Sequence, residues 1–123
     1  MAKRLLSIIE LGGYPNFGPL YERLGFEGTT VSVMRKALTT AKKLQPDVVV
    51  AEFNYQSDFR DRTSSLESLL AVVQRLPATK VIVFLEKEYA HQFERVASRF
   101  PIHAALTFPI EPQELEQALA ALR

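Results

Sequence analysis

The chain of 123 residues has no cysteine and only two histidines. Without cysteine there is no disulfide framework, no thiolate nucleophile and no cysteine-ligated zinc. The histidines, His91 and His103, do not form a metal-ligand pattern such as HExxH, so we interpret both as surface residues. No metal site is predicted from these residue types.

The chain also lacks an excess of either charge. Its 15 basic and 14 acidic side chains give a formal net charge of +1. A protein that binds nucleic acid through phosphates needs a surplus of cations to neutralise them. Nucleic acid is therefore not an expected partner.

Long hydrophobic runs are absent as well. None approaches the roughly 20 apolar residues that cross a bilayer. The first residues combine two cations with an apolar run, as a signal peptide does, but Glu10 and the turn at Gly12 to Pro15 end that run early. We interpret this segment as a first strand and expect a soluble, cytoplasmic protein without membrane contact.

The composition is that of one globular domain. Hydrophobic residues make up 47% of the chain and charged residues 24%, and no linker, repeat or low-complexity tract interrupts it. This length supports one hydrophobic core and is too short for two ordinary ones. A single domain over residues 1–123 is predicted.

Apolar segments rich in β-branched or large side chains alternate with helical patterns. The expected strands are Leu5–Leu11, Thr29–Met34, Val48–Phe53, Val81–Leu85 and His103–Phe108. The expected helices are Pro19–Leu24, Arg35–Leu44, Ser65–Leu76, Glu88–Phe100 and Pro112–Leu122. This alternation predicts a (βα)5 chain.

The strands are apolar almost throughout, as Val81–Leu85 shows, so both of their faces must be covered. A parallel sheet between two helical layers does this, and right-handed crossovers favour a doubly wound α/β fold with strand order 2-1-3-4-5. Ligands bind such sheets in the crevice at the carboxyl ends of the strands. Glu10, Glu52, Leu85 and Phe108 are expected at or near that crevice.

Three segments carry a resemblance to a known family. They are the Pro46-Asp47 start of the third strand, the fourth strand at Val81–Val83, and the ending Leu106–Leu115 with its Pro109. Together they resemble the receiver domain of bacterial two-component response regulators, the chemotaxis-type, flavodoxin-like fold, from about Lys3 to Leu122. The resemblance implies signal transduction.

The resemblance also implies where the family's chemistry would lie. Receivers hold Mg²⁺ with two acidic residues after the first strand and an aspartate after the third, and this aspartate is phosphorylated. The matching positions here are Ile9-Glu10 and Glu52. Glu52 therefore stands at the phosphoacceptor position, and Glu10 is what remains of the acidic pair.

Three further positions depart from the family pattern. The hydroxyl residue after the fourth strand is Leu85, the aromatic switch residue is Ala105, and the lysine before Pro109 is Phe108. We interpret the chain as a pseudo-receiver that has lost aspartate phosphorylation. We expect Phe108 to pack on an apolar crevice and the Phe108-Pro109 bond to be cis, as the family's lysine-proline bond is.

Two interpretations of Glu52 stay open at this point. It either imitates a phosphorylated aspartate electrostatically, or it is an ordinary solvated carboxylate at the end of a strand. A weak cation site between Glu10 and Glu52 is a further alternative, since cations bind between converging acids. We favour the ordinary carboxylate and predict no metal and no cofactor.

The segment from Phe53 to Ser64 is longer than the family's loop and carries residue types that are enriched at interaction hot spots. The candidates for contact with a partner are Phe53, Tyr55, Phe59, Arg60 and Arg62. The alternative is that the aromatic residues fold down over the crevice while the charged ones stay solvated. The leading hypothesis is a signalling module that binds another protein without phosphorylation, with homodimers as a further option.

Other function classes find less support in the sequence. A flavodoxin-like domain could bind a small ligand around Gly12, Gly13 and Phe108, but the glycines match neither G-x-G-x-x-G nor a P-loop. An enzyme would need a nucleophile paired with a base, and none is seen. We therefore expect no catalytic activity.

Overall fold

The computed structural model describes residues 3–9, 17–53, 65–76 and 78–122. Within these ranges five strands alternate with five α-helices and one 3-10 turn. The strands are β1 (Lys3–Ile8), β2 (Phe26–Val31), β3 (Val48–Glu52), β4 (Lys80–Leu85) and β5 (Ala104–Thr107). The helical elements are α1 (Gly18–Arg23), α2 (Met34–Leu44), α3 (Ser65–Val73), η1 (Lys87–Tyr89), α4 (Ala90–Ala97) and α5 (Pro112–Ala120).

The strands form one parallel sheet in the order β2-β1-β3-β4-β5, which confirms the predicted topology. β3 lies in the centre, and all five of its residues are buried. In its register with β4, Glu52 lies opposite Phe84. The last residue of the central strand therefore reaches the carboxyl edge of the sheet.

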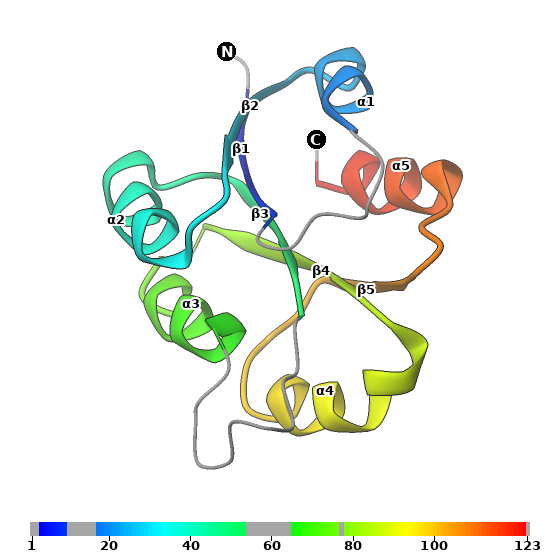
Figure 1. Cartoon of the computed structure of the whole chain (residues 1–123). Coiled ribbons are helices and arrows are strands. Elements are labelled where there is room, and N and C mark those ends of the chain that lie inside the picture. The colour runs from blue at the N-terminus through cyan, green and yellow to red at the C-terminus, as the bar shows by residue number, and fades with distance from the viewer. Residues whose placement is uncertain (1–2, 10–16, 54–64, 77, 123) are drawn as a thin grey trace.

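Helices cover both faces of the sheet, as Figure 1 shows. α1 and α5 pack on one face over a cluster that includes Leu5, Val50 and Phe84. α2, α3 and α4 pack on the other face over a cluster that includes Val49 and Val83. Because successive side chains of a strand point to opposite faces, residues on alternate positions of β3 contribute to the two halves of the core.

β2 differs from the prediction. It was expected over Thr29–Met34, whereas the structure places it at Phe26–Val31 and begins α2 at Met34. The turn after α1 is tight because Gly25 has a φ of 89°, a value that favours glycine, and β2 follows at once. Four of its six residues are exposed at the sheet edge, so the apolar pattern marks this strand poorly.

The other elements agree with the sequence patterns to within a few residues. α5 begins at Pro112 as expected, because proline fits the first turn of a helix. The expected fourth helix is divided into the 3-10 turn η1 and the shorter helix α4. Among the helices of the described ranges, none has the length and apolar character to cross a membrane.

Candidate functional site

The carboxyl edge of the sheet is fixed by backbone hydrogen bonds one residue beyond the strands. Ile9 N donates to Val31 O over 3.0 Å, and Phe108 N donates to Leu85 O over 2.8 Å. Between them, Phe53 N donates to Phe84 O, also over 2.8 Å. The positions that would carry receiver chemistry are therefore held on a regular parallel edge.

Glu52 is buried at this edge, with only 2% of its surface exposed. The alternation of side chains along β3 places it on the same face as Val48 and Val50, toward the layer of α1 and α5. The expectation of a solvated carboxylate is therefore wrong. Glu52 is buried because β3 is the central strand and is covered on both faces up to its last residue.

The surroundings of this half of the edge are mainly aromatic. Phe84, opposite Glu52 in the register, meets Phe17 edge to face with ring centroids 5.8 Å apart. On the same face of the sheet, the side chains of Ser7 and Tyr21 are buried and within hydrogen-bonding reach of each other. Burial raises the pKa of the Tyr21 phenol above its usual range, and the hydrogen bond with Ser7 acts in the opposite direction.

Neither Ser7 nor Tyr21 was predicted from the sequence to belong to this edge. The signal in the sequence was the hydroxyl of Ser7 within the apolar run of residues 5–8. A buried polar side chain needs a hydrogen-bond partner, so this position implied one. The partner lies on α1, and a spacing of fourteen residues along the chain does not reveal it.

The position of Phe53 contradicts one of the two predictions made for it, the contact with a partner. It is 2% exposed and packs edge to face on Phe93 of α4, with ring centroids 5.5 Å apart. Phe53 is therefore a core residue, and its place in a partner-binding surface was wrongly predicted. Tyr55, Phe59, Arg60 and Arg62, the rest of the candidate interaction loop, lie outside the described residues, as do Glu10, Gly12 and Gly13.

At the end of β5, the Phe108-Pro109 peptide bond is cis, as predicted. Phe108 itself is 39% exposed, so its side chain is partly covered and partly open to solvent. Leu85 is buried in the core, whereas Ala105 and Pro109 are exposed. The positions that correspond to the receiver lysine and hydroxyl thus carry one half-exposed ring and one core side chain.

The described residues of this edge do not fit a hydrated Mg²⁺. The ion prefers oxygen ligands in octahedral geometry and keeps several of its waters. Ile9 offers no side-chain oxygen, and the carboxylate of Glu52 is shielded from solvent. We therefore derive no step through a metal ion at this edge.

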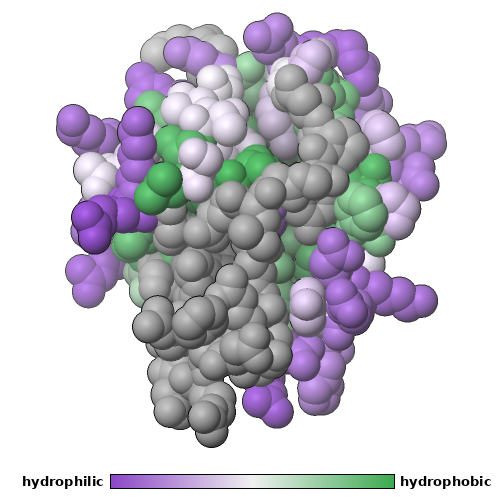
Figure 2. Space-filling model, in the orientation of Figure 1, coloured by the Kyte–Doolittle hydropathy of each residue, from purple (hydrophilic) through white to green (hydrophobic). Residues whose placement is uncertain are grey.

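Figure 2 shows the molecule in the orientation of Figure 1, coloured by hydropathy. Hydrophilic side chains project around the margin of this view, and hydrophobic ones lie nearer its middle.

No model of a known protein family and no curated protein matches this sequence. Solved structures do match it. A response regulator receiver domain protein from Clostridium thermocellum has a TM-score of 0.78 at 20% identity, with 99% of this chain and 94% of that chain covered. The chemotaxis response regulator CheY4 of Vibrio cholerae has a TM-score of 0.76 at 17% identity over the full length of both chains.

A response regulator protein from Burkholderia multivorans gives a TM-score of 0.74 at 22% identity and covers 99% of this chain and 95% of its own. At such identities the likeness concerns the fold. The resemblance predicted from the sequence is thereby confirmed at that level: the chain has the five-stranded fold of response regulator receiver domains.

Proposed function

We propose that this chain, which has the receiver fold, is a pseudo-receiver: a signalling module that binds another protein without being phosphorylated. In this proposal it acts in the cytoplasm, within two-component-type signalling, and is not an enzyme. The departures from the receiver pattern at Glu52, Leu85 and Phe108 support this function.

The observation that carries the proposal is the burial of Glu52. A phosphoacceptor must meet an incoming phosphodonor, and a side chain with 2% exposure does not present its oxygens to one. Phe108 reinforces the argument, because a phenyl ring offers no charge to hold a transferred phosphoryl group. Phosphoryl transfer also depends on cations that neutralise developing charge, and the described residues of the edge provide no ligands that suit Mg²⁺.

Because the carboxyl edge does not support phosphoryl transfer, we propose that this receiver fold acts by binding a partner. The surface formed by α4, β5 and α5 offers exposed positions at Ala105 and Thr107 on an edge strand. The unpaired edge of β5 and its flanking helices present a rigid frame on which a partner could dock. We propose this surface, together with the segment at residues 54–64, for contact with the signalling partner.

Intact mass spectrometry after incubation with acetyl phosphate and Mg²⁺ tests the proposal. We expect the mass of the chain to stay unchanged, while a receiver with an aspartate at the end of its third strand gains one phosphoryl group in the same reaction. A phosphoryl adduct on this chain that disappears in the Glu52→Gln variant would refute the proposal.

A further inference from the structure

Opposite charges gather at opposite edges of the sheet around β4. Near the carboxyl end of β4, four acidic side chains accompany a single cation of η1, Lys87. These acids are Glu86, Glu88, Glu111 and Glu114. The amino end has exposed cations at Lys42, Arg75 and Lys80 instead. The described side chains around β4 thus differ in charge between its two ends.

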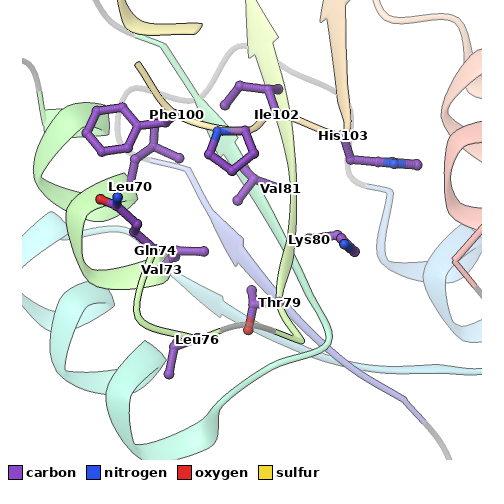
Figure 3. A pocket seen from close by; sticks show the side chains of 11 residues that line it. Leu70, Val73, Gln74, Leu76, Thr79, Lys80, Val81, Phe100, Ile102 and His103 are labelled. Atoms are coloured by element: carbon purple, nitrogen blue, oxygen red, sulfur yellow. The ribbon is translucent and has the colours of Figure 1, made fainter. Parts of the chain in front are cut away.

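The amino edge also carries a hollow of about 340 Å³, shown in Figure 3. Its apolar lining comes from α3, β4 and the segment before β5: Leu70, Val73, Leu76, Val81, Phe100 and Ile102. Figure 3 shows Leu70, Val73 and Gln74 on the α3 side and Val81 and Ile102 across from them. An apolar cavity of about 150 Å³ is large enough to take up benzene, so this hollow has room for an aromatic side chain.

The rim of the hollow is basic. Lys80 and His103 line it next to β4 and β5, and no acidic residue belongs to its described lining. A second depression on the other side of α3 shares Leu76 and is bordered by Lys42 and Arg75. A group that fits this edge is therefore an apolar side chain flanked by carboxylates.

The carboxyl edge of the same chain presents such a group. Phe108 is the residue after β5, and it is 39% exposed. Glu86 is the residue after β4, and the two strands end side by side because Leu85 pairs with Thr107. Glu111 lies three residues after Phe108, at the start of α5. Because the hollow lies at the amino end of β4 and Phe108 at the carboxyl end of β5, the two lie at opposite ends of the sheet.

We propose that Phe108 of one copy inserts into the amino-edge hollow of a second copy, with Glu86 and Glu111 facing Lys80 at the hollow. The contact joins two different surfaces, so it is heterologous and continues head to tail instead of closing as a symmetric dimer. It goes beyond the proposed function and does not depend on phosphorylation. One ring and exposed charge pairs make a weak contact, and the attraction decreases with salt.

Sedimentation velocity of the whole chain over a range of concentrations at low ionic strength tests this proposal. We expect the weight-average sedimentation coefficient to rise with concentration, and the rise to diminish at high salt. Phe108→Ser removes the inserted ring, and Gln74→Trp fills the hollow from an exposed position just after α3. Each variant alone should weaken self-association by at least about tenfold.

The decisive experiment mixes the two variants. Phe108→Ser keeps the hollow and Gln74→Trp keeps the ring, so an equimolar mixture should form dimers that stop at two copies. Val33→Ser, which alters the other large exposed apolar side chain, is the matched control and should associate like the original chain. Circular dichroism confirms that each variant is folded.

Three results would overturn the proposal. They are a chain that stays monomeric at every concentration, single variants that associate as strongly as the original, and a mixture of folded variants that does not dimerise. Growth of the original chain beyond two copies separates this contact from a symmetric dimer, which closes at two copies.

Discussion

The two edges of the sheet carry opposite kinds of surface. At the carboxyl edge, where receivers perform their chemistry, the described side chains of the central strands are buried, and the one carboxylate at the phosphoacceptor position is among them. At the amino edge an open apolar hollow is bordered by cations. In this chain the carboxyl ends of the central strands are closed off as core, whereas the opposite edge of the sheet keeps an open hollow.

The same substitution at the two edges should have very different effects on stability. Phe84→Ala removes a ring that is 1% exposed and packs on Phe17, so we expect unfolding to become easier by about 3–5 kcal/mol. Phe100→Ala removes a half-buried ring at the amino-edge hollow and should cost at most about half as much. Urea denaturation measures both, and equal losses would contradict the comparison.

A smaller effect is expected from the hydroxyl pair beneath the carboxyl edge. Tyr21→Phe leaves the buried Ser7 hydroxyl without its tyrosine partner, so we expect a loss of about 1–2 kcal/mol in the free energy of unfolding. The double variant with Ser7→Ala should lose less than the sum of the two single variants. Additive losses in urea denaturation would show that the two hydroxyls do not interact.

The same pair predicts a dependence on alkaline pH. Burial raises the pKa of Tyr21 in the folded state above its unfolded value of about 10, so the unfolded chain releases this proton first. The stabilising contribution is complete below that value and decreases as the pH rises above it. We expect the original chain to lose stability above pH 10 more steeply than Tyr21→Phe, and parallel curves would contradict this.

The smallest effect concerns the extra methylene of Glu52. Glu52→Asp shortens a side chain that is 2% exposed, and it should cost about 1 kcal/mol, the contribution of one buried methylene. Thermal or urea unfolding measures the change. An unchanged or increased stability would indicate that the aliphatic part of Glu52 is not packed against the layer of α1 and α5.

The sequence was sufficient to predict most of the fold. The apolar character of Val48–Glu52 and Val81–Leu85 predicted central strands covered on both faces, and the proline before α5 predicted its start. These features depend on local patterns, which a single sequence contains. The cis Phe108-Pro109 bond was instead implied by the resemblance to receiver domains, and the structure confirms it.

The features that were missed depend on contacts between distant segments. β2 was displaced by three residues because its edge position exposes residues that the apolar pattern needs to be buried. The burial of Glu52 and Phe53 depends on which helices cover the end of β3, and their spacing in the chain does not show this. The amino-edge hollow combines α3, β4 and the segment before β5, which meet only in the folded chain.

The most direct test of the central claim is carbodiimide-mediated labelling of carboxylates in the folded protein, quantified for each glutamate by peptide mass spectrometry. The account predicts that Glu88 and Glu111, which are exposed, react readily while Glu52 reacts only after unfolding. Labelling of Glu52 in the folded chain at the rate of those exposed glutamates would contradict a carboxylate withdrawn from solvent.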